Sequence, residues 1–151
     1  MGYAVLHIDK ARSNDSGNTA HIARTYTPSN VDPSRTRLNR ELVQFPANVT
    51  NRSEAIEHRI ATAGIYRKVA KNQVKALRFI LSSSPEDMAR IEQEGLLYEW
   101  CDESMDWLRS TFGADNVVAA TLHADEDTPH IHATVVPIVT GERRKAKEEA
   151  E

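Results

Sequence analysis

Two apolar segments joined by a short polar turn constrain the fold of this chain more than any other feature. The first covers residues 116–124 and the second covers residues 130–139. The first is rich in Val and Ala, and the second is rich in Val and Ile. In the parts nearest the turn, residues 121–124 and 130–133, apolar residues alternate with polar ones, as is typical of strands with one buried face. A turn as short as 125–129 joins antiparallel neighbours. The sequence therefore predicts a β-hairpin with one face in the core.

Three histidines occupy alternate positions of this hairpin. His130 and His132 point to the same side of the second strand, because side chains alternate along a strand. An antiparallel register whose paired residue numbers sum to 253 or 255 puts His123 on that side too. The opposite side is apolar and suits a core beneath helices: Val118, Ala120 and Leu122 in the first strand, and Ile131, Ala133, Val135 and Val139 in the second. The three imidazoles are therefore expected to converge on the side without helices.

Three neutral imidazoles on adjacent strands are a metal-ligand set with open coordination positions, which is the pattern of catalytic sites. Zinc suits them by affinity, whereas Mn²⁺ or Mg²⁺ suits a site that also binds phosphate oxygens. Asp125 and Glu126 in the turn can orient a histidine or act as a base, and Asp127 is expected to be a plain turn residue. Two histidines in a strand can also be an accident of the surface.

The remaining pattern completes an α+β domain with a mostly antiparallel sheet and helices on one face. Strands are expected at residues 3–8 and 74–81, and residues 11–19 read as a loop. A helix is expected to begin with Ser53 as its N-cap. A long helix is expected from Ser84 to about Phe112, with Gly95 as an interruption.

Charge is divided unevenly between the two halves of the chain. Residues 1–81 contain 13 basic residues (Lys and Arg) and 6 acidic residues (Asp and Glu). Residues 82–151 contain 6 basic and 16 acidic residues. This division indicates either a one-sided footprint for nucleic acid or an uneven surface without a partner. The single cysteine, Cys101, fits a reducing cytoplasm, and the sequence contains no apolar run of membrane-spanning length and no signal-peptide pattern at its start.

Three segments resemble motifs of one protein family. Residues 123–132, HADEDTPHIH, resemble the HxDExxPHxH motif of the Mob/Pre (MobV) relaxases, which belong to the HUH endonucleases. Residues 21–24, HIAR, resemble the family's HNxR motif, with Ile22 in place of Asn. Residues 30–42, NVDPSRTRLNREL, resemble its second motif. The three occur in the family's order and cover most of the chain.

This resemblance implies a five-stranded antiparallel sheet with helices behind it. It also implies metal-dependent, site- and strand-specific nicking at an origin of transfer, with a covalent link to the 5′ side of the nick. The expected partners are origin DNA, single-stranded and hairpin, and a conjugative coupling protein in a bacterial cytoplasm. Residues 1–140 are then the relaxase catalytic domain. Residues 141–151 are a charged linker or the start of a truncated C-terminal region.

The resemblance also implies roles for single residues. His21 is the expected nucleophile, which gives a phosphoramidate, and Tyr26 is the competing nucleophile. Glu126 is expected to take or orient the proton of the nucleophile, with Asp125 as the second choice. Arg24 is expected to pair with a phosphate.

Residues of the second motif offer donors for phosphates or base edges. The family often has an aromatic residue where Arg40 stands. Lys71 extends the basic surface, although a solvated helix face explains it equally well. The expected DNA-binding residues are Arg24, Arg35, Arg37, Asn39, Arg40 and Lys71.

Three other functions fit parts of the pattern. A rolling-circle replication initiator has the same metal site with a tyrosine nucleophile. A small-substrate metallohydrolase predicts a zinc-filled site without affinity for DNA hairpins. A non-catalytic DNA-binding module predicts structural histidines and DNA binding that survives chelation.

Overall fold

A computed structural model describes residues 4–24, 28–64 and 73–139. Its centre is a five-stranded sheet in the order β1-β3-β5-β4-β2, and every neighbouring pair is antiparallel. The strands are β1 (Ala4–Ala11), β2 (Arg40–Glu41), β3 (Ala76–Ser83), β4 (Val117–His123) and β5 (His130–Val135). The expected α+β fold with a five-stranded antiparallel sheet is confirmed.

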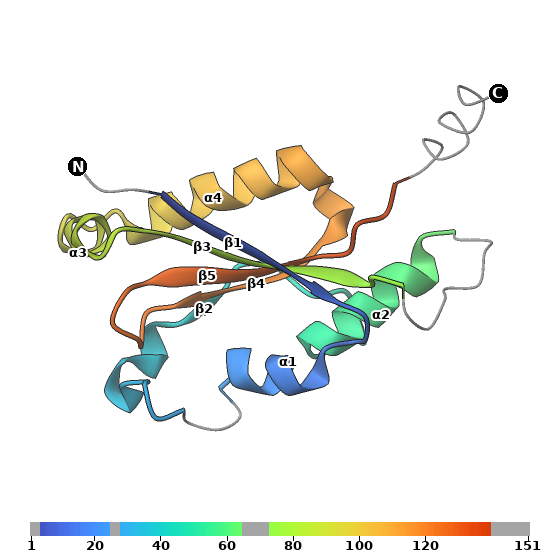
Figure 1. The fold of residues 1–151 in the computed structure, drawn as a ribbon, viewed down its shortest axis with the longest axis horizontal. Helices are drawn as coiled ribbons and strands as arrows, with labels where there is room; N and C mark the ends of the chain where they lie inside the picture. The colour runs from blue at the N-terminus through green and yellow to red at the C-terminus, as the bar shows by residue number, and fades with distance from the viewer. Residues whose placement is uncertain (1–3, 25–27, 65–72, 140–151) are drawn as a thin grey trace.

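Helices cover both faces of the sheet, not one as predicted from the sequence (Figure 1). On one face lie α3 (Pro85–Gln93) and α4 (Leu97–Phe112), and on the other lie α1 (Ser16–Ile22) and α2 (Arg52–Thr62). The second layer forms because α2 buries Ala55 and Ile56 against apolar residues of β4. Two short 3-10 helices, η1 (Pro33–Leu38) and η2 (Ala114–Asn116), complete the described part. None of the described helices has the length and apolar character to cross a membrane.

The register of the hairpin agrees with the prediction. His123 pairs with His130 and Thr121 pairs with His132, which is the register whose paired numbers sum to 253. Leu122 and Ile131 consequently lie on the opposite face and pack in the core formed with α3 and α4. The histidines therefore occupy the face of α1 and α2.

Two predictions about the core side of the hairpin were wrong. The register shifts between Val117 and Ala119, and this irregularity turns Val118 into the core beneath α2. Val139 lies beyond the end of β5 and is 67% exposed.

Side-chain hydrogen bonds to backbone N–H groups determine which residues cap α2 and α3. Ser84 caps α3 as predicted, accepting from the backbone N–H of Asp87 at 3.2 Å. Gly95, with a φ of +71°, separates α3 from α4, so the predicted single helix is two. Asn51 caps α2 in place of Ser53, because its side chain accepts from the N–H of Glu54 at 2.9 Å.

The loop predicted at residues 11–19 contains most of α1 instead. This segment has no apolar stripe to reveal a helix. Tertiary contacts select the helix, because Thr19 and Ile22 are buried and the Thr19 hydroxyl bonds to the buried Ser53 hydroxyl at 2.7 Å. The Ser53 side chain thus fastens α1 to α2.

Candidate metal centre

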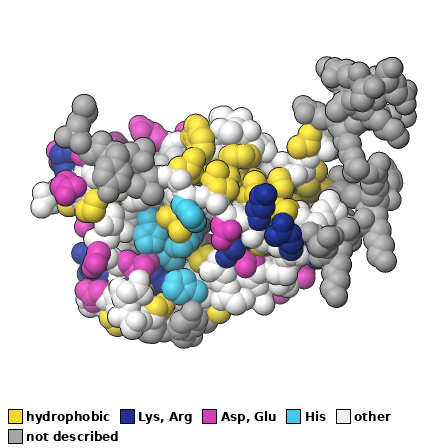
Figure 2. Space-filling model, viewed as in Figure 1, with side chains coloured by type: hydrophobic (Ala, Val, Ile, Leu, Met, Phe, Trp, Pro, Cys, Tyr) yellow, Lys and Arg dark blue, Asp and Glu magenta, His cyan; other side chains and the backbone are white. Residues whose placement is uncertain are grey.

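The three hairpin histidines meet on one face of the sheet. Their ring centroids are 4.6 Å apart for His123 and His132, 4.8 Å for His130 and His132, and 5.4 Å for His123 and His130. One nitrogen from each ring and one oxygen of Glu126 all lie within 4.8 Å of one another. Figure 2 shows histidine side chains gathered in one patch of this face. The predicted convergence of three imidazoles is confirmed.

The hydrogen bonds of the rings leave lone pairs directed at a common point. The Nε2–H of His123 donates to the Ile22 carbonyl at 2.8 Å, which leaves its Nδ1 as a lone pair. That Nδ1 is buried and has no hydrogen-bond partner among the residues that the structure describes. His130 donates from Nδ1 to the Thr128 carbonyl at 2.8 Å, so its Nε2 carries the lone pair that faces His132.

This donor set fits a bound cation. The Nε2 atoms of His130 and His132 are 3.1 Å apart. Nitrogen atoms this close to each other can both reach one divalent ion. A buried nitrogen without a partner is costly in a protein interior. A metal ion accounts for both observations.

Burial keeps two of these histidines neutral, which is the form that binds metal. Burial, with the nearby charges of Arg24 and His130, lowers the pKa of His123 to about 4. Burial and the charges of His123 and His130 hold the pKa of His132 well below its ordinary value.

These depressed pKa values predict that the metal-free protein loses stability in mild acid. Below pH 6.5 the unfolded chain takes up protons at His123 and His132, while the folded chain does not until about pH 4. Between these values the free energy of unfolding should fall by up to about 1.4 kcal/mol per pH unit for each histidine. Urea denaturation at pH 7.5, 6.0 and 5.0 with EDTA measures this loss. Mn²⁺ should reduce this loss of stability. If the free energy of unfolding without metal does not change between pH 7.5 and 5.0, the two rings are not buried as described.

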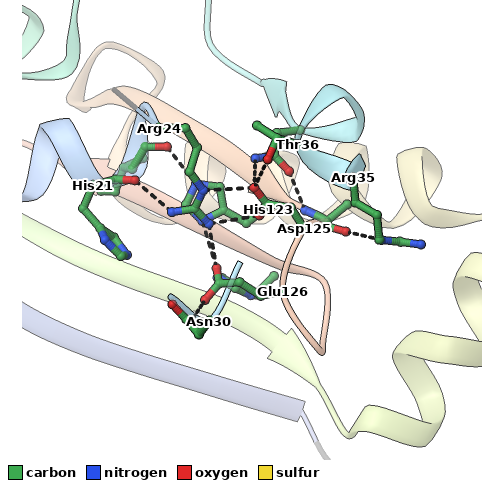
Figure 3. A network of polar contacts seen from close by, with 12 residues as sticks. His21, Arg24, Asn30, Arg35, Thr36, His123, Asp125 and Glu126 are labelled. Atoms are coloured by element: carbon green, nitrogen blue, oxygen red, sulfur yellow. Dashed lines mark hydrogen bonds and ion pairs between the residues drawn. The ribbon is translucent and has the colours of Figure 1, made fainter. Parts of the chain in front are cut away.

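A salt bridge anchors the turn that follows His123 (Figure 3). Arg24 donates to both oxygens of Asp125, from Nε and Nη2, each at 3.0 Å. Asp125 has no exposed surface and also accepts from Thr36 at 2.9 Å and from Asn39 at 3.0 Å. Burial by itself raises the pKa of Asp125, but the hydrogen bonds from Arg24, Thr36 and Asn39 outweigh it and hold this pKa well below its usual range.

The anchor contradicts three of the predicted roles. Asp125 is ionised and its oxygens are occupied, so it is unsuited to the role of base. The Arg24 guanidinium is committed to Asp125, Glu126 and the His21 carbonyl, and only 7% of its side chain is exposed, so it is not free for phosphate. Asn39 bonds to Asp125 and to the Ala124 backbone N–H and is equally occupied.

Glu126 lies at the rim of the histidine cluster. Its Oε2 is 3.2 Å from Nε2 of His130 and 3.5 Å from Nδ1 of His123. Arg24 donates to the same oxygen at 2.9 Å, and Asn30 donates to Oε1 at 2.8 Å. This carboxylate is therefore held by Arg24 and Asn30 while it faces the imidazole nitrogens. Sequence reasoning missed Asn30, although it is the first residue of the second motif.

His21 lies in the last turn of α1, one residue before the carbonyl that fixes His123. Its side chain points away from Arg24 in Figure 3. Its charge is one of the smaller causes that lower the pKa of His132, after burial and the charges of His123 and His130. Tyr26 and Lys71, the competing nucleophile and a predicted DNA contact, lie outside the described residues.

The remaining arginines of the second motif lie toward the β2 edge. Arg35 donates to the Ala124 carbonyl and to Glu92, both at 2.8 Å, and is therefore engaged within the protein. Arg37 and Arg40 are exposed. The Arg40 guanidinium lies 5.7 Å from the ring centroid of Tyr98. Two of these three predicted DNA contacts thus remain accessible to a partner.

Comparisons with known proteins agree with this geometry. A family model described as plasmid recombination enzyme, Mob_Pre, matches residues 1–151. The type 3 plasmid recombination enzyme of Staphylococcus aureus is 32% identical over 98% of this chain, and a plasmid recombination enzyme of Streptococcus agalactiae is 23% identical over 93%. The chain spans 37% and 29% of the lengths of these two relatives.

Solved structures show the same fold. The MobM relaxase domain bound to plasmid pMV158 oriT DNA, in an Mn-bound crystal structure at pH 5.5, superposes with a TM-score of 0.79 at 26% identity. A second crystal structure of that complex at pH 4.6 gives a TM-score of 0.80 at 25% identity. The match covers 92% of this chain and 72% or 73% of the solved chains.

Proposed function

This chain belongs to the Mob/Pre family of plasmid recombination enzymes, and we propose that it is a metal-dependent relaxase that nicks one DNA strand at an origin of transfer. The observation that supports this most is the convergence of three imidazoles on one sheet face in a fold shared with an Mn-bound, DNA-bound relaxase domain. Residues 1–140 are then the catalytic unit in the bacterial cytoplasm, and its partners are origin DNA and a conjugative coupling protein.

The proposed ligands are His123, His130 and His132, and the ion is Mn²⁺ or Mg²⁺, with zinc as the alternative. When bound, a divalent ion supplies a Lewis acid that neutralises charge on the non-bridging oxygens of a phosphodiester. The Ile22 and Thr128 carbonyls orient two of the rings so that their lone pairs face inward.

His21 is the proposed nucleophile. Its neutral ring nitrogen attacks the phosphorus, a P–N bond forms and the bond to the 3′ oxygen breaks. The ring gives its own proton to Glu126, which passes a proton to the departing 3′ oxygen, so that this oxygen leaves as a hydroxyl. Arg24 supports this assignment indirectly, because it holds the Glu126 carboxylate and the His21 carbonyl at once.

Glu126 has a second candidate role as a fourth ligand. Its Oε2 lies as close to the imidazole nitrogens as they lie to each other, at 3.2 Å and 3.1 Å. Glu126→Gln distinguishes the roles, because loss of a ligand weakens Mn²⁺ binding, whereas loss of a proton acceptor slows nicking at saturating Mn²⁺.

The test of the function is incubation of the protein with a single-stranded oligonucleotide carrying the cognate origin. With Mn²⁺ we expect a strand break and a protein–DNA adduct by mass spectrometry, and with EDTA neither. A His130→Ala/His132→Ala variant is expected to lose both Mn²⁺ binding and nicking. DNA binding that persists without cleavage in any divalent metal would instead indicate a non-catalytic module. Hydrolysis of small phosphoesters without DNA affinity would indicate a metallohydrolase.

A further inference from the structure

The described residues close the histidine cluster on most sides. The end of α1 covers β4, where the Ile22 carbonyl bonds to the His123 ring. Arg52 of α2 reaches over β5 and donates to the Thr134 hydroxyl at 2.6 Å, with only 5% of Arg52 exposed. Arg24, Asp125 and Glu126 close the side of the turn. Within the described part of the chain, the sheet surface that continues from the cluster without a helix above it is that of β3 and β1.

The register identifies the side chains on this surface. Ile80 of β3 pairs with His132, and His7 of β1 pairs with Ile80, so the three lie in one row on the same face. His7 is exposed and Ile80 is half-buried. Two strand spacings place His7 roughly 10 Å from His132 along this row. The row therefore leads from the metal centre to the edge of the sheet.

We propose that the row formed by His132, Ile80 and His7 is the track on which the DNA strand lies as it leaves the metal centre, with His7 donating to a backbone phosphate. This inference rests on the proposed function, because it takes the scissile phosphate to sit at the histidine cluster. His7 is assigned no role by the motifs of the sequence, since it lies outside all three of them.

The chemistry of the track suits a single strand better than a protein partner. An imidazole N–H donates to phosphate in its neutral and its charged form. Ile80 offers an apolar surface on which an unstacked base can rest. Asp9 follows His7 on the same face and would repel phosphate, but its carboxylate is bonded to Arg78 at 2.8 Å. The opposite side of the same strand presents Leu6 and Ile8 to the layer of α3 and α4, whose helices carry many acidic residues.

The neighbour of His7 provides a matched control. Ile8 is also exposed, at 50%, but it points to the other face of β1. Both residues lie at the free edge of the sheet, so His7→Ala and Ile8→Ala are expected to fold with similar melting temperatures. His7→Ala alters the face of β1 that carries the proposed track, and Ile8→Ala alters the opposite face of the same strand.

The experiment measures binding of a fluorescein-labelled single-stranded oligonucleotide of mixed sequence, with Mn²⁺, by anisotropy. His7→Ala should weaken binding about 3- to 10-fold at any sequence, which is typical of a phosphate contact, while Ile8→Ala should leave Kd unchanged. His7→Arg should restore binding and steepen the slope of log K against log salt by about 0.7. The proposed track is wrong if His7→Ala leaves Kd unchanged, or if Ile8→Ala weakens DNA binding as much as His7→Ala does.

Failure of the track and failure of the proposed function give different results. If wild-type protein nicks origin DNA and His7→Ala binds as tightly as Ile8→Ala, only the track is wrong. If wild-type protein does not nick in any metal but His7→Ala still weakens binding, the nicking function is wrong and the DNA surface stands.

Discussion

Replacing Asp125 with alanine is expected to lower the free energy of unfolding by about 3–5 kcal/mol, although Asp125 contacts no histidine of the cluster. The substitution leaves the Arg24 guanidinium buried without its main counter-charge and removes the acceptor of the Thr36 and Asn39 hydrogen bonds. Arg24 keeps only one carboxylate partner, Glu126, and a buried cation that loses its two-bond carboxylate partner costs far more than a lost surface pair. Urea denaturation at neutral pH measures the difference.

Asp127→Ala is the matched control for this prediction. Asp127 lies two residues away in the same turn but is exposed, so its removal should change stability by less than about 0.5 kcal/mol. Adding Arg24→Met to Asp125→Ala should recover part of the loss, because the unpaired charge is then gone. A cost for Asp125→Ala as small as that of Asp127→Ala would show that the Arg24 bridge is not an anchor.

The hairpin was predictable because its two faces carry different chemistry. A strand register shifted by one residue would move the histidines to the side of Leu122 and Ile131, so the apolar alternation excludes that register. It leaves registers two residues apart open, and the fold has the one whose paired numbers sum to 253. The same reasoning placed Val118 on the wrong side, because an irregularity in β4 interrupts the alternation. The residue types around Val118 do not predict this irregularity.

The roles of the charged residues were less predictable than their positions. Arg24, Asn39 and Asp125 are all found in the motifs, which makes them candidates for chemistry, yet they bond to one another. A sequence pattern does not distinguish a charge that faces the substrate from one that is buried against an opposite charge. The distinction arises only when segments about 100 residues apart in sequence, such as those of Arg24 and Asp125, are folded together.

The second core layer was missed for a related reason. The side of the hairpin that carries the histidines looked too polar to be covered, and residues 11–19 showed no apolar stripe. In the fold, α2 attaches to that side through Ala55 and Ile56 and through the bond from Arg52 to Thr134 of β5. Polar contacts of Thr19 with Ser53 and Arg52 then hold α1 to α2. This covering places the Ile22 carbonyl against the His123 ring, one residue after His21.

His21→Ala is expected to reduce adduct formation on origin DNA by at least about 10³-fold, while Tyr26→Phe leaves it within a few-fold of wild type. The reason is positional: His21 lies in the last turn of α1, next to Ile22, whose carbonyl orients the His123 ring. Mn²⁺ affinity should hardly change in either variant, since neither residue belongs to the ligand set. Single-turnover assays with labelled oligonucleotide and calorimetric Mn²⁺ titration measure the two quantities.

His58→Ala is the control for losing a histidine from a helix on the same side of the sheet, and it should nick normally. The linkage itself gives a second readout, because a phosphoramidate is cleaved by acid whereas a tyrosine phosphodiester survives it. An acid-stable adduct that disappears in Tyr26→Phe and persists in His21→Ala would reverse the assignment. The metal site would then serve a tyrosine nucleophile, as in a rolling-circle initiator. An acid-labile adduct lost only in His21→Ala would make the last turn of α1 the part of the fold that carries out the covalent step.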